Sequence, residues 1–268
     1  MGTISDRIAI DKKRAKLLAR IKEFRLLDDD FMTKCFEDSI ECTELILKII
    51  LERDDIKVKV SKTQYNQKNL KGRSVRLDIY AEDTKNKKYD IEIQRDDRGA
   101  GKKRARYNSA ILDSEAIIPG QCTEDLPESF VIFITENDIF GKGLPLYHIE
   151  RYIKETGKVF DDEEHIIYVN GAYRGDSPIG KLMYDFSCKN PDDMHYSLLA
   201  KQTRYYKEDE KGVAAMCRAV EELIDDEKMK EKKEAAVRFI KAGKLSLEEI
   251  ANGLDLSLDI VQSIKDEL

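Results

Sequence analysis

Several patterns that mark common classes of protein are missing from this 268-residue sequence. The five cysteines are scattered, odd in number and form no Cys-x-x-Cys pair, so neither a disulfide framework nor a zinc knuckle is indicated. No apolar run reaches the roughly 18–20 residues that span a bilayer, and the first residues form no apolar signal segment. We therefore expect a cytoplasmic protein with reduced thiols and no membrane association.

The common catalytic motifs are missing as well. There is no G-x-x-x-x-G-K-[ST] phosphate-binding loop, no G-x-S-x-G nucleophile elbow and no H-E-x-x-H zinc motif. The three histidines, His148, His165 and His195, are far apart and show no metal-ligand spacing. We expect each histidine to be structural.

The charge balance limits the kind of nucleic-acid binding that is expected. The formal net charge is −6 and the sequence pI is about 5.4, whereas a passive, high-affinity nucleic-acid coat would be basic. An enzyme that contacts a polyanion through a local basic patch remains compatible with this balance. The length suits one large domain, or one domain and an appendage, and a hydrophobic fraction of 41% allows a core to form.

A predicted β-hairpin lies at the centre of the chain. Its strands cover residues 73–81 and 89–94, and both alternate apolar and polar side chains. If the turn centres near Lys85, antiparallel pairing sets Asp78 directly opposite Glu92, with Gln94 one step further along the same face. Two carboxylates at that spacing can hold one hard divalent cation. The alternative is a half-buried hairpin that simply shows its polar face to water.

The segments around this hairpin predict an α/β domain with a mixed sheet. Helix patterns cover residues 6–27, 39–52 and 102–115, strand patterns cover 56–60, 130–134 and 166–169, and the chain is mostly helical after residue 178. The helix at 102–115 begins with a basic cluster that could neutralise phosphates beside the hairpin or form a solvated face. That cluster consists of Lys102, Lys103, Arg104 and Arg106.

Three parts of the chain are distinguished by their composition. Residues 1–27 form an N-terminal helical arm, 28–224 form the main domain, and 225–268 form a charged spacer and a helical tail. The tail contains a capping box at Ser246–Glu249 and two short helices that resemble a helix-turn-helix pair. Because its second helix is acidic, we favour docking or self-association, as a homodimer or higher homo-oligomer, over reading of a DNA groove.

The order of these motifs resembles that of the PD-(D/E)XK nuclease superfamily. Asp78 lies in one strand, Glu92-Ile93-Gln94 lies in the next, and a basic helix follows. The wider context resembles the branch of PD-(D/E)XK nuclease family transposases, the Rpn-like recombination-promoting nucleases. The resemblance spans roughly residues 28–224 and implies a restriction-endonuclease-like core, in which a mixed central sheet is flanked by helices, with a helical C-terminal extension.

The resemblance also implies a function. It implies a Mg²⁺-dependent endodeoxyribonuclease, with Mn²⁺ as a substitute. The Rpn-like branch further implies a link to DNA recombination or a mobile element. On this basis Asp78, Glu92 and the Ile93 carbonyl would be metal ligands. A further acid would come from Glu44 or Asp30, and DNA would be the partner.

Two positions depart from the name-giving motif of the superfamily. Leu77 stands where the proline would be, which is a structural position, and Gln94 stands where lysine is usual. The neutral amide of Gln94 can position a water only by hydrogen bonds. The Rpn-like branch also uses glutamine here. The alternative function is therefore a catalytically weak or inactive protein of nuclease fold that binds nucleic acid or a protein partner.

Overall fold

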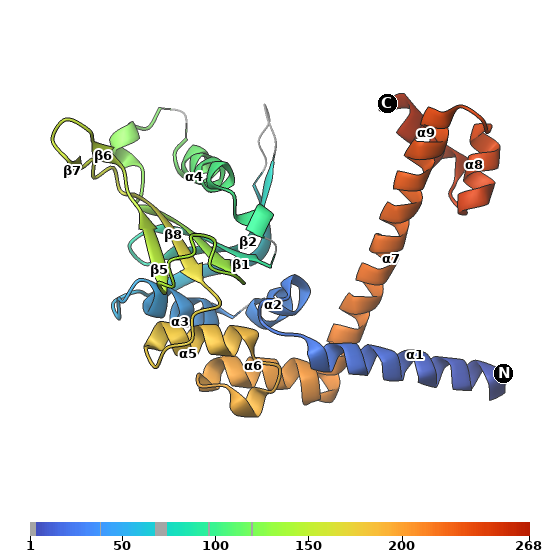
Figure 1. The fold of residues 1–268 in the computed structure, drawn as a ribbon, viewed down its shortest axis with the longest axis horizontal. Coiled ribbons are helices and arrows are strands. Elements are labelled where there is room, and N and C mark those ends of the chain that lie inside the picture. Colours follow the sequence, from blue (N-terminus) through green and yellow to red (C-terminus); the bar gives the residue numbers. More distant parts are fainter. Residues whose placement is uncertain (1–3, 38, 68–73, 96, 119) are drawn as a thin grey trace. The chain divides into compact units, whose positions relative to one another are not determined.

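The computed structural model describes residues 4–37, 39–67, 74–95, 97–118 and 120–268. A six-stranded mixed sheet with the strand order β1-β2-β3-β4-β8-β5 forms the centre of the main domain (Figure 1). The strands pair antiparallel except for β3 with β4 and β4 with β8, which are parallel. Helices flank the sheet and a helical region ends the chain, so the predicted fold class is confirmed.

The elements have the following bounds. The strands are β1 Val58–Gln67, β2 Val75–Asp83, β3 Lys88–Gln94, β4 Ser129–Thr135, β5 Leu146–Ile149, β6 Tyr152–Ile153, β7 Lys158–Val159 and β8 Glu164–Asn170. The α-helices are α1 Ile4–Glu23, α2 Asp29–Phe36, α3 Ile40–Ile50, α4 Lys102–Ala116, α5 Pro178–Ser187, α6 Ser197–Glu208, α7 Glu210–Ala242, α8 Leu247–Leu254 and α9 Leu258–Asp266. Short 3₁₀ turns lie at Asp97–Ala100, Thr123–Asp125 and Pro191–Asp193.

One face of the central strands is continuously apolar. Ile79, Ile91, Ile132 and Ile167 follow one another across β2, β3, β4 and β8, and all four are buried. Cross-strand neighbours of this kind are the main packing units of a sheet. In Figure 1 helices α2, α3 and α5 lie on one side of the sheet and α4 lies on the other.

The face beneath α4 changes from apolar to acidic along the sheet. Val131, Phe133 and Tyr168 of β4 and β8 pack with Ala105 of α4. Their cross-strand neighbours on β3 are acids, because Asp90 pairs with Val131 and Glu92 pairs with Phe133. The strand alternation therefore carries two carboxyls under the same helix that covers the aromatic core.

The structure extends some predicted elements and adds others. Strand β1 continues to Gln67, beyond the predicted end at residue 60, because the polar segment pairs with β2 through contacts such as Tyr65 opposite Leu77. Arg73, expected at the start of the next strand, lies outside the described residues. The short strands β5, β6 and β7 were not predicted.

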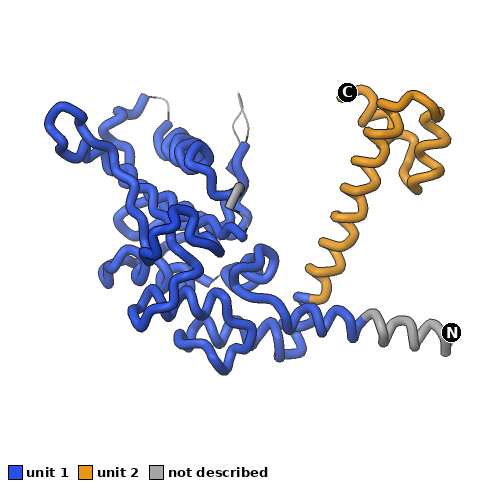
Figure 2. The backbone as a smooth tube through the Cα atoms, in the orientation of Figure 1, with its two compact units in different colours: residues 1–216 blue, residues 217–268 orange. Residues whose placement is uncertain are grey.

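The C-terminal helices form a compact unit of their own. The chain divides between Met216 and Cys217 (Figure 2). The boundary expected after Ile224, and the charged spacer, both lie inside the 33-residue helix α7. A separate core forms in this unit from Ala236, Ile250, Ala251 and Val261.

The predicted capping box is present at the start of α8. The backbone N–H of Glu249 donates to Ser246 Oγ at 3.1 Å, and the backbone N–H of Ser246 donates to Glu249 Oε2 at 2.7 Å. These bonds satisfy N–H groups that have no partner within the helix.

Among the described helices, none is long and apolar enough to cross a membrane.

The separate core of the C-terminal unit predicts independent folding of the two parts. We expect a chain that ends after Ile224 to keep the thermal unfolding midpoint of the main domain within about 5 °C, because the deleted residues carry their own buried cluster. Differential scanning calorimetry checks this, and sedimentation of both chains checks whether the tail causes self-association. A collapse of the remaining domain would contradict the division.

Candidate active site

Asp78 and Glu92 lie on the same face of the sheet, under α4. The ladder pairs Tyr80 with Asp90 and ends at Ile79 and Ile91, and the same register continued by one residue sets Asp78 opposite Glu92. Asp78 is 8% exposed and Glu92 is fully buried. The register that the hairpin pattern predicts is therefore present in the structure.

Asp78 also bonds to the backbone of β3. Its Oδ2 accepts a hydrogen bond from the backbone N–H of Ile93 at 2.9 Å. In an extended strand the N–H and C=O of one residue point to the same side, so the Ile93 carbonyl is directed toward β2 as well. The two carboxyls and this carbonyl are the oxygen atoms that the family resemblance implies as metal ligands.

Asn108 of α4 joins Glu92 to a second buried acid, Asp90. Its side-chain amide donates to Asp90 Oδ2 at 2.9 Å and to Glu92 Oε1 at 3.3 Å. The other oxygen of Asp90 is buried and has no hydrogen-bond partner. Asp90 was visible in the sequence as a polar position of the second strand, but nothing there indicated that α4 would enclose it.

Burial makes these acids hard to ionise. Desolvation, followed by the charge of Glu92, raises the pKa of Asp78 to about 7. Burial likewise raises the pKa of Asp90 and of Glu92, which both accept hydrogen bonds from the Asn108 amide. Arg104 contacts only Glu92 of this pair, so its positive charge favours the ionised form of Glu92.

The guanidinium that contacts Glu92 belongs to Arg104, in the first turn of α4. One of its nitrogens donates to Glu92 Oε2 and another donates to the Gly99 carbonyl at 2.9 Å. The group also lies 5.7 Å from the centre of the Phe133 ring. Arg104 is thus held by a carboxylate, a carbonyl and an aromatic face, and it is more than a solvated residue of a basic helix.

Gln94 lies beside the same carboxylate. Its Nε2 donates to Glu92 Oε2 at 3.4 Å. Gly99 leaves the space that Gln94 needs, because a Cβ at position 99 would lie 2.0 Å from Gln94 Oε1. The glycine therefore controls the orientation of the residue that replaces the usual lysine.

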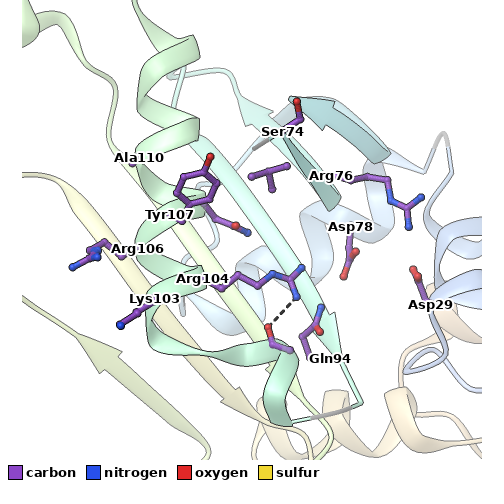
Figure 3. A pocket seen from close by; sticks show the side chains of 13 residues that line it. Asp29, Ser74, Arg76, Asp78, Gln94, Lys103, Arg104, Arg106, Tyr107 and Ala110 are labelled. Atoms are coloured by element: carbon purple, nitrogen blue, oxygen red, sulfur yellow. Dashed lines mark hydrogen bonds between the residues drawn. The ribbon is translucent and has the colours of Figure 1, made fainter. Parts of the chain in front are cut away.

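A cleft of about 1180 Å³ opens between α4 and the edge of β2 (Figure 3). Asp29 and Asp78 lie on one wall, and Arg104 reaches from α4 toward Gln94. Glu92 does not line the cleft. The full lining consists of Asp29, Ser74, Val75, Arg76, Asp78, Gln94, Gly99, Lys103, Arg104, Arg106, Tyr107, Asn108 and Ala110.

Three of the four basic residues selected from the sequence line this cleft. Lys103, Arg104 and Arg106 do so, whereas the Nζ atom of Lys102 lies 5.7 Å from the centre of the Phe140 ring. Arg76 of β2 was not selected but also lines the cleft. Strand alternation could have found it, since residues 76 and 78 share a face.

The additional acid of the cleft is Asp29, at the start of α2. Gln64 Nε2 donates to Asp29 Oδ1 at 2.8 Å, and the charge of Asp29 contributes to the raised pKa of Asp78. Asp30, the neighbouring candidate, does not line the cleft. Position 29 was not selected because the sequence does not show which of three adjacent acids turns toward the sheet.

Glu44, the other candidate acid, lies elsewhere. It accepts hydrogen bonds from Lys48 Nζ at 2.7 Å, Lys57 Nζ at 3.2 Å and the backbone N–H of Val58 at 3.0 Å. Although burial acts in the opposite direction, these donors lower the pKa of Glu44. Its contacts join α3 to the start of β1, which is a structural role.

The donor atoms of the site suit a hard cation. Within the described ranges no group of three or more His, Cys, Asp or Glu side chains is arranged to hold a metal ion. The available set is two carboxyls and a backbone carbonyl, to which Mg²⁺ would add several waters, as it commonly does. The carboxyl oxygen of Asp90 without a partner and the raised pKa values indicate that the protein alone does not fully compensate the ionised forms of these acids.

Comparison with known families agrees with this geometry. The model of the family described as PD-(D/E)XK nuclease family transposase matches residues 40–171. By this match the segment resembles that family. The match includes the hairpin, α4, β4 and β8, and thus every element of the site except α2. No curated protein and no solved structure shows a significant match to the chain.

The raised pKa of Asp78 predicts that this carboxyl destabilises the metal-free protein. Its folded pKa of about 7 exceeds the unfolded value of about 3.9, so stability falls as the pH rises from about 4 through 7. We expect Asp78→Asn to stabilise the protein, with a gain that is about 1–3 kcal/mol larger at pH 8 than at pH 5. Urea unfolding with a chelator present measures this difference.

Asp55→Asn is the matched control for that measurement. Asp55 is exposed, and hydrogen bonds from Arg53 and Lys85 lower its pKa, so its substitution should not stabilise the protein at either pH. An equal effect of Asp78→Asn at pH 5 and pH 8 would contradict the assignment of a raised pKa to Asp78.

Proposed function

We propose that this protein is a divalent-cation-dependent endodeoxyribonuclease that hydrolyses phosphodiester bonds in DNA, in a recombination or mobile-element setting. The observation that carries the proposal is the position of Asp78 and Glu92 on one face of β2 and β3, beside a cleft with four basic residues. The match of residues 40–171 to a nuclease family supports DNA as the substrate.

The residues that would hold the cation are Asp78, Glu92 and the carbonyl of Ile93. Bound Mg²⁺ or Mn²⁺ would supply an acidified water and stabilise the negative charge that develops on the phosphate. Asn108 fixes one oxygen of Glu92 through its hydrogen bond, which orients the carboxylate before any cation arrives. Asp29 supplies the further acid on the cleft wall, in the role considered for Asp30 and Glu44.

Gln94 would orient the attacking water. Its side-chain amide lies beside Glu92 and lines the cleft, where it can donate and accept hydrogen bonds but cannot carry charge. Glutamine therefore supports positioning of a water, and the positive charge at the site must come from another residue.

Basic residues around the cleft would bind the DNA backbone. Arg76 from β2 and Lys103 and Arg106 from α4 line it, while the chain as a whole has a net charge of −6. Phosphate binding would thus be local and would weaken as salt rises, because neutralised phosphates release counterions. An overall acidic protein can still present such a patch.

A plasmid-nicking assay with Mg²⁺ or Mn²⁺ tests the proposal. We expect the wild type to nick supercoiled DNA, and Asp78→Asn and Glu92→Gln each to slow nicking at least about 100-fold, since each removes a cation ligand. Glu44→Gln, on a carboxylate outside the cleft, should stay within about threefold of the wild type. Between neighbours, Asp29→Asn should reduce the rate more than Asp30→Asn.

The results that contradict the proposal are equally specific. Cleavage that survives both Asp78→Asn and Glu92→Gln would place the chemistry at a different site. DNA binding without cleavage in either metal would favour the alternative, a catalytically inactive protein of nuclease fold. The observation that favours this alternative is the neutral Gln94, which stands where lysine is usual.

Gly99→Ala tests the positioning role of Gln94. The new methyl group would occupy the place of Gln94 Oε1 and turn this flexible side chain away, so the fold should be kept. We expect a thermal midpoint within about 3 °C of the wild type and nicking slowed about tenfold or more. Gly120→Ala has open space around the new atom and controls for the loss of a glycine, although its φ of 97° adds local strain. Unchanged nicking in Gly99→Ala would show that the orientation of Gln94 does not matter.

A further inference from the structure

Glu92 is closed off from the cleft that it is expected to serve. The residue is fully buried and does not line the cleft, whereas Asp78 does. Its Oε1 accepts from Asn108, and its Oε2 accepts from both Gln94 and Arg104. Each oxygen of this carboxylate therefore already has a protein partner, and none faces the space from which a cation would enter.

The group that covers Glu92 on the cleft side is the guanidinium of Arg104. This side chain is 36% exposed and lines the cleft, while it contacts the fully buried carboxylate beneath it. Its second anchor is the Gly99 carbonyl at 2.9 Å, in the short turn that precedes α4. Arg104 thus spans the entrance between this turn and the buried acids (Figure 3).

We propose that Arg104 occupies the cation position at Glu92 in the metal-free protein, leaves Glu92 when a divalent cation binds, and then contacts the scissile phosphate. This inference rests on the proposed function. The physical basis is that an isolated buried carboxylate is costly, so the fully buried carboxylate of Glu92 needs a counter-charge when no metal is bound. A guanidinium supplies that charge while the site is empty of cation.

The same displacement would provide the charge that Gln94 lacks. Arg104 lies on α4 beside Lys103, at the cleft wall, and its long side chain can turn from Glu92 toward the open cleft without moving the helix. A guanidinium there can bind two phosphate oxygens at once. Arginine and cation would therefore exchange places at Glu92 and act on opposite sides of the same phosphate.

Competition between Arg104 and the cation is measured without DNA and without turnover. Titration calorimetry with Mn²⁺ at pH 8 should show about tenfold tighter binding to Arg104→Gln than to the wild type, because a like charge has been removed from the cation position. Arg106→Gln is the matched control, since Arg106 loses the same charge from the same helix and forms no ion pair with Asp78 or Glu92 in the described chain. Its Mn²⁺ affinity should stay within twofold of the wild type.

Nicking assays on the same variants separate the two roles of Arg104. Arg104→Gln should bind Mn²⁺ more tightly and yet nick DNA at least about 30-fold more slowly, whereas a residue that only binds DNA would leave Mn²⁺ affinity unchanged. Arg104→Lys keeps the charge but cannot contact Glu92 and Gly99 with separate nitrogens in one plane. Its Mn²⁺ affinity should therefore lie between that of the wild type and that of Arg104→Gln. This variant keeps the test valid if the glutamine variant fails to fold.

The inference and the proposed function fail in different ways. Equal or weaker Mn²⁺ binding by Arg104→Gln and Arg104→Lys, with a wild type that binds Mn²⁺ and nicks DNA, would overturn the role of Arg104 and leave the nuclease proposal standing. A wild type whose Mn²⁺ binding is unaffected by Asp78→Asn and Glu92→Gln would overturn both, because the cation would not be held at this site.

Discussion

The enclosure of three carboxyls between the β2–β3 hairpin and α4 is the constraint on which the site depends. Asp78, Asp90 and Glu92 are nearly or fully buried, although ionised carboxylates strongly favour water. Two groups of α4 offset this cost by donating hydrogen bonds to the buried acids: the amide of Asn108 and the guanidinium of Arg104. Arg104 and Asn108 are one helical turn apart, so they lie on one face of α4 and can both bond to the acids of β3.

The acids lie where the sheet changes from antiparallel to parallel pairing. Strand β3 is antiparallel to β2 on one side and parallel to β4 on the other. The described β2–β3 pairing ends at Ile79 and Ile91. Beyond it, the Asp78 side chain accepts a hydrogen bond from the backbone N–H of Ile93. A carboxylate thus replaces a backbone carbonyl as the acceptor, so the β2–β3 ladder ends beside the cleft without leaving this donor unsatisfied.

Strand alternation is why the central pair could be predicted from the sequence. Asp78 and Glu92 each lie between apolar residues of a short strand, and a shift of one residue would have exposed an apolar face. The same periodicity reaches Arg76, which lines the cleft. Local patterns of this kind also predict the capping box of α8 and the buried strand β4, because each depends on neighbours in the chain.

Contacts between distant segments could not be predicted in this way. Glu44 and Asp29 are both helical acids, and only the tertiary contacts of Glu44 with Lys57 and of Asp29 with Gln64 separate a structural acid from one at the cleft. The continuity of α7 has a similar origin. Its mixed charges at residues 225–234 predicted a solvated helix that acts as a spacer, but not that this helix would be continuous with the segments on both sides of it.

Stability and function oppose each other at this site, and the direction of the pKa shifts shows how. A carboxyl with a raised pKa makes the folded chain less stable at neutral pH, since ionising it in the folded protein costs more than in the unfolded chain. The same unfavourable charge is what attracts a divalent cation, because cation binding relieves it. An arginine that can leave is a better temporary partner for such acids than a fixed one, since a permanent ion pair would remove the electrostatic gain that binding requires.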